Sequence, residues 1–292
     1  MSETLTTTTA PAKDPRLMVL EGIDLIGRAN TSDEVVLENI RASIRRGHPV
    51  LHRQPLNGDR ICLVGSGPSL NDTLDELVAL HHAGAKIVAL NGSYQWLLQH
   101  HLRPSMLIML DARPENARFV DPPVPQCRYA IASQCHPRVW DALDGRENVW
   151  IWHAMTETGA EKPILDDYYL GRWEGVGGGT TVATRALSLL RLLGYLRYDL
   201  FGIDSCWFGN EHHAFPQIEN AADKQYAIEV APVDDPARVR IFRCAPWHLK
   251  QFEDVLQWVR VNGQLVALAV HGDGLIAHAL MTSASLTIRE EE

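Results

Sequence analysis

The sequence predicts an α/β protein in which a mostly parallel sheet carries helices on both faces. Short, continuously apolar segments recur through the middle of the chain, and segments with helical spacing separate them. Polar or glycine-rich residues follow directly after most of the apolar segments. Continuous apolar strands with intervening helices are typical of parallel sheets that are buried on both faces.

The first expected element is a helix over residues 32–46. Ser32 is suited to cap its start, and apolar residues recur from Val35 to Ile40 at helical spacing. The last residues of this helix are basic, which suits the negative end of a helix dipole. A connector over residues 49–58, which holds proline and glycine, separates the helix from the first strand.

Strands and helices are expected to alternate from Arg60 onward. The expected strands cover residues 61–64, 86–90, 106–110, 128–132, 149–152 and 198–202. The expected helices cover residues 72–82, 93–100 and 181–193. Ligands of such sheets bind beyond the carboxyl ends of the strands, so the residues that follow each strand are the site candidates.

The composition argues against several classes of protein. The chain has 292 residues, of which 46% are apolar and 22% are charged, so it can form a globular core. Its net charge of −9 argues against a nucleic-acid partner. The five cysteines are scattered and form no C-x-x-C pair, which argues against both a secreted disulfide framework and a zinc site.

Membrane and export signals are also missing from the sequence. No apolar run approaches the roughly 20 residues that span a bilayer. The longest candidate, residues 265–280, is interrupted by His271, Asp273 and His278. Residues 2–13 are polar and rich in threonine, without the apolar core of a signal peptide. We therefore expect a cytoplasmic protein without a membrane partner, and the sequence leaves an oligomer open.

The first candidate site is a glycine-rich turn between an expected strand and an expected helix. Its residues are Gly65, Ser66, Gly67, Pro68, Ser69 and Leu70. Glycines permit a sharp turn whose N–H groups face an anion, with a helix N-terminus behind them. The turn is not a Walker A loop, and Leu70 stands where a dinucleotide-binding fingerprint has its third glycine. We expect a phosphate or ribose site here, with a purely structural tight turn as the alternative.

The second candidate site is a glycine loop that precedes the expected helix over residues 181–193. Gly178 and Gly179 are followed by Thr180 and Thr181. Either threonine can cap the helix while free N–H groups face a phosphate or carboxylate. The alternative is a flexible loop with an ordinary cap.

Acidic, amide and imidazole side chains follow further strands. Asp204 ends a strand and precedes His212 and His213, and Asp111 ends another. A carboxylate at such a position can hold Mg²⁺ or a ribose hydroxyl, and an imidazole can act as general base near neutral pH. Asn91 stands where a dinucleotide enzyme offers an acid to the ribose. Ordinary turn and surface positions for these residues remain the alternative.

The order and spacing of these residues resemble the archaeal 6-hydroxymethyl-7,8-dihydropterin diphosphokinase (MptE-like) superfamily, which also includes bacterial motility accessory factors. The resemblance covers about residues 60–213, more than half of the chain. The residues that carry it are the turn 65–70, Asn91, Arg103, Pro104, Asp111, the loop 178–182 and the strand end 202–204.

The resemblance implies a Rossmann-like domain that transfers a group from an activated nucleotide. One branch of the superfamily moves diphosphate from ATP to a pterin hydroxymethyl group with Mg²⁺, and the other moves a nonulosonic acid sugar from CMP. Sialyltransferases of similar fold share the turn at residues 67–70, the stretch 193–204 and a downstream histidine base, which His212 or His213 could match. The loop at residues 177–181 has one glycine more than the pattern, and the region after Glu219 lies outside it, so the substrate cannot be carried over.

The resemblance favours transfer of diphosphate from ATP to a pterin-like hydroxymethyl acceptor, with Asp111 and Asp204 as Mg²⁺ ligands. The alternatives are a CMP-sugar-dependent glycosyltransferase acting on a small molecule or glycan, and a nucleotide-binding protein without catalysis. The catalytic candidates are Asp111, Asp204, His212 and His213. The nucleotide-binding candidates are Gly65, Ser66, Gly67, Pro68, Ser69, Asn91, Gly178, Gly179, Thr180 and Thr181. We expect a disordered tail over residues 1–15, a helical segment and connector over 16–59, and one nucleotide-binding transferase domain over 60–285.

Overall fold

The computed structural model describes residues 31–216, 223–232, 235, 237–282 and 284–290. The predicted tail over residues 1–15 lies outside the described residues, as does the first part of the predicted segment 16–59. In the part of the chain that the structure describes, no helix has both the length and the apolar character to cross a membrane.

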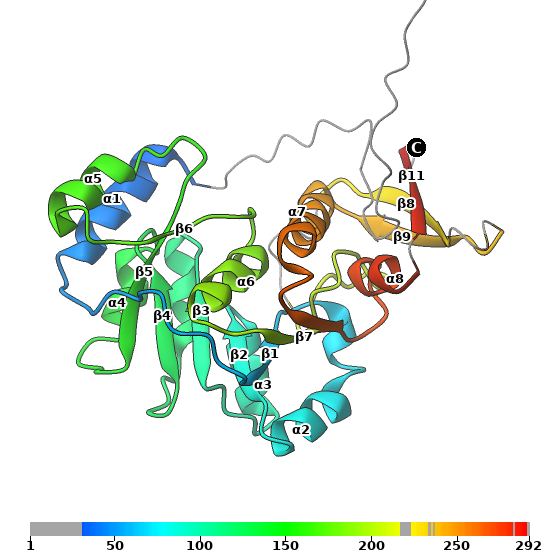
Figure 1. The fold of residues 1–292 in the computed structure, drawn as a ribbon, viewed down its shortest axis with the longest axis horizontal. Coiled ribbons are helices and arrows are strands. Elements are labelled where there is room, and N and C mark those ends of the chain that lie inside the picture. Colours follow the sequence, from blue (N-terminus) through cyan, green and yellow to red (C-terminus); the bar gives the residue numbers. More distant parts are fainter. Residues whose placement is uncertain (1–30, 217–222, 233–234, 236, 283, 291–292) are drawn as a thin grey trace, which may run out of the picture.

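Within the described residues, the core is a parallel sheet of eight strands in the order β10-β7-β1-β2-β3-β4-β5-β6. The strands are β1 (Arg60–Val64), β2 (Lys86–Leu90), β3 (Met106–Met109), β4 (Arg128–Ala132), β5 (Val149–Ala154), β6 (Gly175–Val176), β7 (Arg197–Phe201) and β10 (Ala267–Val270). Helices lie along both faces of this sheet (Figure 1). The predicted Rossmann-like α/β class is therefore confirmed.

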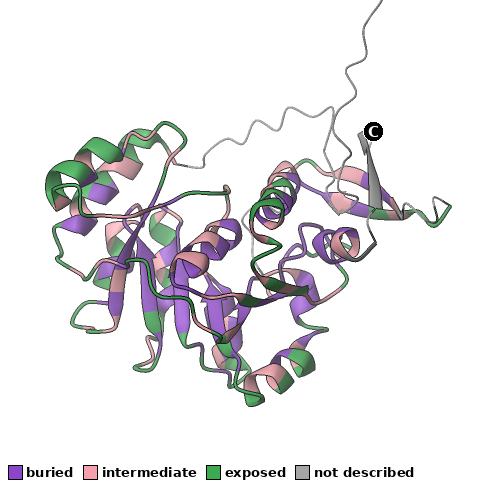
Figure 2. Cartoon of the chain, viewed as in Figure 1, coloured by how far each residue is buried: buried purple, intermediate pink, exposed green. Residues whose placement is uncertain are grey.

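Four of these strands share a simple pattern that explains where they begin. β1, β2, β4 and β7 each start at a lysine or arginine that is not buried and continue with four buried residues. The basic residue lies at the amino end of each strand, where its charge can reach solvent or an acidic partner, while the four residues after it are covered from both faces of the sheet. Figure 2 shows this buried layer running along the strands of the sheet.

The helices agree with the sequence in part. The predicted ones are α1 (Asp33–Ile44), α2 (Leu74–His82), α3 (Ser93–Gln99) and α6 (Val182–Leu192). α2 starts two residues later than predicted, because a 3₁₀ turn over Pro68–Leu70 and a further turn occupy the residues before it. The sequence did not predict α4 (Pro137–Asp141), α5 (Lys162–Tyr169), α7 (Pro246–Asn262) or α8 (Leu275–Thr282).

α1 is attached to the carboxyl ends of the sheet by side chains on its inner face. The Ser32 side chain accepts from the N–H of Val35, which confirms the predicted cap. Asn39 donates to the carbonyls of Ala112 and Gln134, and Ser43 donates to that of Ser133. The described part of the N-terminal segment therefore packs on its own chain, next to the strand ends where ligands bind.

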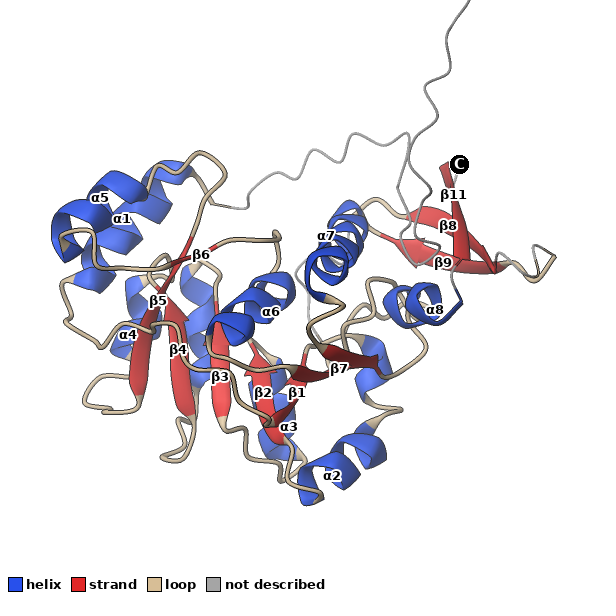
Figure 3. Ribbon diagram, in the orientation of Figure 1, coloured by secondary structure: helices blue, strands red, loops and turns tan. Residues whose placement is uncertain are grey.

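A second, antiparallel sheet follows the first in the chain. It has the order β11-β8-β9, with strands β8 (Tyr226–Pro232), β9 (Arg240–Cys244) and β11 (Ala284–Glu290). Figure 3 shows this sheet apart from the parallel one, at the end of the molecule that α7 and α8 also occupy. α7 contacts α6 as well as β9 and so connects the two parts.

Candidate functional site

A cavity of about 870 Å³ lies over the carboxyl ends of the strands, between the parallel sheet and α7. This volume is in the range of small-molecule sites. The structure brings most of the predicted site residues into its lining: Gly65, Ser66, Gly67, Asn91, Asp111, Gly179, Thr180, Thr181, Asp204, His212 and His213. Pro68, Ser69 and Gly178 do not line it.

The first glycine turn packs directly on the end of β7. The N–H of Gly65 donates to the carbonyl of Phe201 at 2.8 Å, and the N–H of Gly67 donates to that of Gly202 at 2.7 Å. A Cβ on Gly67 would lie 2.4 Å from Oδ2 of Asp204, and one on Gly65 would lie 2.4 Å from the Gly202 oxygen. These glycines are therefore required by packing within the protein, and Ser66 between them lines the cavity.

Asp204 fastens the turn to the end of β7. Its side chain accepts from the Ser69 hydroxyl at 2.5 Å and from the Ser69 N–H at 2.9 Å, one bond on each oxygen. Asp204 is 4% exposed, and burial raises the pKa of its carboxyl to about 6. With both oxygens engaged and the charged form disfavoured, this group is better suited to hold the turn than to bind a cation.

Asp111, the other predicted metal ligand, is held in an ion pair. The guanidinium of Arg113 donates to both carboxylate oxygens, at 2.7 Å from Nη2 and 3.0 Å from Nε, and the Arg113 N–H adds a bond of 2.9 Å. Within the described residues, no three His, Cys, Asp or Glu side chains gather as a metal site would need. Hard cations such as Mg²⁺ need carboxylate or carbonyl oxygens that are open to them. The donor set of Asp111 and Asp204 therefore does not fit a Mg²⁺ ion held by the protein.

The second glycine loop begins α6 with its polar groups already engaged. Thr181 and Thr184 form a reciprocal cap, in which each side chain accepts from the other residue's N–H. The N–H and hydroxyl of Thr180 donate to Oδ2 of Asp254, at 2.7 and 2.9 Å. The Thr181 hydroxyl donates to Gln251 at 2.9 Å. Side chains of α7 therefore occupy the position that the sequence suggested for a bound anion.

The predicted histidines lie beside the first glycine turn. The N–H of Ala214 donates to the carbonyl of Ser66 at 2.9 Å, which ties this segment to the turn. His212 is 6% exposed and lies against Trp207, with ring centroids 4.6 Å apart. The His213 ring is 4.4 Å from that of His212 and is half-buried, so it is the more accessible of the two.

A third histidine, which the sequence did not suggest, completes this corner of the cavity. His248, in the first turn of α7, is 2% exposed, and its Nδ1 accepts from the N–H of Ala245. Burial and the neighbouring His213 and His212 lower its pKa well below the ordinary value. His248 is therefore neutral, and the bond at Nδ1 places its proton on Nε2.

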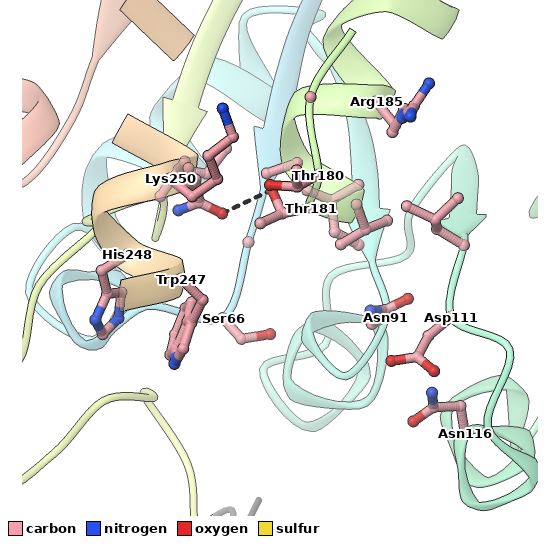
Figure 4. A pocket seen from close by; sticks show the side chains of 18 of the residues that line it. Ser66, Asn91, Asp111, Asn116, Thr180, Thr181, Arg185, Trp247, His248 and Lys250 are labelled. Carbon is pink, nitrogen blue, oxygen red and sulfur yellow. Dashed lines mark hydrogen bonds between the residues drawn. The ribbon is translucent and has the colours of Figure 1, made fainter. Parts of the chain in front are cut away.

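Several other lining residues lie in parts of the chain where sequence reasoning found no motif. They are Gln251 and four residues that are labelled in Figure 4, namely Asn116, Arg185, Trp247 and Lys250. The indole N–H of Trp247 donates to Asp223 at 2.9 Å, which fixes the ring in the cavity wall. Asn116 is 2% exposed, and its Nδ2 has no hydrogen-bond partner among the residues that the structure describes. The proline at the start of α7 and the helical spacing of its apolar residues could have predicted this helix from the sequence. They could not have predicted that its side chains line a cavity.

Comparison with known proteins identifies relatives by sequence and by fold. The family model described as "6-hydroxymethylpterin diphosphokinase MptE-like" matches residues 35–210, more than half of the chain. No curated protein matches the sequence.

Among solved structures, the MAf glycosyltransferase from Magnetospirillum magneticum AMB-1 has a similar fold, with a TM-score of 0.59 and 16% identity, over 90% of this chain and 44% of that one. The chain thus spans less than half the length of that protein. A weaker match is a mammalian sialyltransferase in complex with Gal-beta-1-3GalNAc-ortho-nitrophenol, with a TM-score of 0.42 and 11% identity, over 84% of this chain and 82% of that one.

Proposed function

We propose, from the premise that this chain belongs to the 6-hydroxymethylpterin diphosphokinase MptE-like family, that it is a transferase whose donor is linked to a nucleotide. The cavity over the carboxyl ends of β1, β2 and β7 supports this, because this edge is where open α/β sheets bind nucleotides. Ser66 and the backbone of the first glycine turn form the floor on which the nucleotide would lie.

We infer further that the transferred group is a sugar from a nucleotide-sugar donor. The observation that carries this inference is that Arg113 and Ser69 bind the carboxylates of Asp111 and Asp204, so neither is open to a metal ion. The contact of Ala214 with Ser66 holds His213 in the cavity beside the turn, where it can act as the base for either donor. A glycosyl donor needs a base for the acceptor hydroxyl, and its nucleoside phosphate leaves with its own negative charge. A CMP-sugar donor, which releases a monophosphate, can therefore react without a metal held by protein carboxylates, in agreement with the engagement of Asp111 and Asp204.

The bond changes in this reaction follow from the arrangement. The imidazole of His213 takes the proton from the acceptor hydroxyl, and the acceptor oxygen forms a bond to the anomeric carbon. The bond from that carbon to the phosphate oxygen breaks, and the nucleoside phosphate leaves with the electron pair. His248, which stays neutral, adds no charge that would oppose protonation of His213.

Transfer of diphosphate from ATP is the second candidate, and the family description favours it. The acceptor hydroxyl would attack the β-phosphorus, form an oxygen–phosphorus bond and release AMP. Any Mg²⁺ in this reaction would arrive as part of the ATP substrate. The same histidine would take the acceptor proton, so the two candidates differ in the donor and not in the base.

Release of the nucleoside phosphate tests the proposal directly. Purified protein is incubated with CMP-linked sugars and acceptor glycans, or with ATP, Mg²⁺ and a hydroxymethylpterin, and release of CMP or AMP is followed by chromatography. Loss of a general base lowers turnover about 100- to 10,000-fold, so His213→Ala should do so with little change in nucleotide affinity. His82→Ala, on the exposed end of α2, is the matched control. Full activity of His213→Ala would refute the assigned role of His213.

A further inference from the structure

The cavity contains an anion position that the protein itself already fills. At the start of α6, the carboxylate of Asp254 accepts both the N–H and the hydroxyl of Thr180. Lys250 lies 3.3 Å from the other oxygen of Asp254 and balances its charge. A substrate anion would have to compete with this side chain for the same groups.

Arg185 also lines this cavity, and its guanidinium is held in place by hydrogen bonds but not by an ion pair with a described residue. It lies one turn into α6, after Thr181, and donates to the carbonyl of Val176 at 2.7 Å and to that of Met155 at 2.8 Å. These bonds hold the guanidinium between the end of β5 and the strand β6. It makes no ion pair within 4.0 Å with any carboxylate of the described chain.

The acids whose charges act on Arg185 form no ion pair with it among the described residues. Asp254 is bound to Thr180, and Glu157 lies on the exposed rim. Buried Glu161 accepts from Thr156 through Oε2, while its Oε1 has no hydrogen-bond partner among the described residues. Burial lowers the pKa of Arg185. The negative charges of the three acids raise this pKa, but by less than burial lowers it. A half-buried guanidinium that is fixed by two carbonyls and forms no ion pair with the described carboxylates is a ready binding group for an oxyanion.

We propose that Arg185 binds an oxyanion of the substrate, so that the bound molecule carries a carboxylate or phosphate beside the ends of β5 and β6. Figure 4 places Arg185 on the other side of Thr180 and Thr181 from Lys250, so this position is distinct from the one that Asp254 fills. The inference rests on the proposed function and narrows its substrate class. The oxyanion is either the phosphate of the nucleotide or an acid group on the transferred sugar or its acceptor.

Paired ligands that differ by one anionic group distinguish the two sources. Isothermal titration compares CMP with cytidine for the phosphate, and glucuronate with glucose in the presence of CMP for the carboxylate. Each pair is measured with the wild type, Arg185→Gln, Arg185→Lys and the control Arg172→Gln, whose side chain is exposed outside the cavity. Thermal unfolding with inorganic phosphate gives a measurement that needs no nucleotide.

In Arg185→Gln a charge-assisted hydrogen bond is lost. The affinity for the anionic ligand of one pair should therefore fall about 10- to 100-fold. The affinity for the neutral ligand should change little. Arg185→Lys should retain part of the affinity for the anion, because lysine keeps the charge but lacks the planar guanidinium with its paired donors. A loss for CMP identifies the phosphate as the source, and a loss for glucuronate alone identifies the acid group.

A purely structural role for Arg185 would lower the affinities of charged and neutral ligands equally, and that result overturns the proposal. Failure of the proposed function gives a different pattern. In that case no nucleotide binds to the wild type, while stabilisation by inorganic phosphate still disappears in Arg185→Gln and supports the anion site alone. If Arg185→Gln changes neither the affinity for the anionic ligands nor the stabilisation by inorganic phosphate, the inference is wrong for either donor.

Discussion

Replacing Asp204 by asparagine should remove a pH dependence of stability that this buried carboxyl gives the protein. The group has an ordinary pKa of 3.8, and burial raises its pKa to about 6 in the folded chain. Between these two values the folded protein holds a proton that the unfolded chain has lost. The free energy of unfolding therefore falls as pH rises through this window, and the full stabilisation is present only below it.

The magnitude follows from the gap between the two values. At about 1.4 kcal/mol for each pKa unit, ionised Asp204 destabilises the fold by about 3 kcal/mol near neutral pH, relative to its protonated form. Asparagine has nearly the same shape, can accept from the Ser69 N–H and can donate to the Ser69 hydroxyl. It keeps the connection between the turn and β7 but does not titrate.

Urea unfolding at a series of pH values from about 4 to 7 measures this difference. The free energy of unfolding of Asp204→Asn, minus that of the wild type, should rise by about 2.4 kcal/mol across the series, because part of the full change lies below pH 4. Other titrating groups are common to both proteins and cancel in the difference. Asp75→Asn, in an exposed part of α2, controls for removal of a carboxylate as such. A difference that stays constant with pH would refute the assignment of Asp204 as a buried group fastened by Ser69.

Two further substitutions test the packing around the site. Gly67→Ala should lower the free energy of unfolding by about 1–3 kcal/mol, because its Cβ would lie 2.4 Å from Oδ2 of Asp204. Gly58→Ala, with open space around it, should change stability by less than about 0.5 kcal/mol in the same urea experiment, and equal effects would contradict the argument. His271→Phe should keep the stacking on Phe201 while losing the bonds to Asp199 and Glu76, which raise the pKa of His271. The ion pairs stabilise the wild type below the ordinary pKa of histidine and fade as pH rises through the raised value. The melting-temperature advantage of the wild type over His271→Phe should therefore shrink from about pH 6 to about pH 9, and an advantage that grows would refute this role.

The strands of the parallel sheet were the most predictable part of the fold. β2 and β4 have the predicted bounds, because each is an apolar run between a basic residue and a polar turn. β6 could not be found this way, since its two residues are defined only by pairing with the end of β5. α7 was predictable in principle: Pro246 lies in its first turn, and Leu249, Phe252 and Val255 recur at helical spacing.

The candidate site was predictable in position but not in chemistry. Residues after the strands do gather at one cavity, because the carboxyl ends of parallel strands lie along the same edge. The sequence could not show that the Asp204 carboxyl is occupied by Ser69, which lies 135 residues away in the chain. Nor could it show that Asp254 accepts a hydrogen bond from the Thr180 N–H at the start of α6, since these two residues are 74 positions apart in the chain. Such pairings arise only when the chain has folded. They turn a carboxylate that could bind a metal, and an N–H that could bind an anion, into groups that hold the fold together.

Nucleotide binding over the first glycine turn is the central claim, and thermal unfolding with CMP or with ATP and Mg²⁺ tests it most directly. A ligand that binds only the folded state stabilises it by about 2.7 kcal/mol at a hundredfold excess over its Kd. At least one of these nucleotides should stabilise the wild type, and Ser66→Tyr, which fills the cavity beside the turn, should abolish the effect. If no nucleotide raises the melting temperature at millimolar concentration, or if Ser66→Tyr binds as tightly as the wild type, the nucleotide does not bind where this account places it.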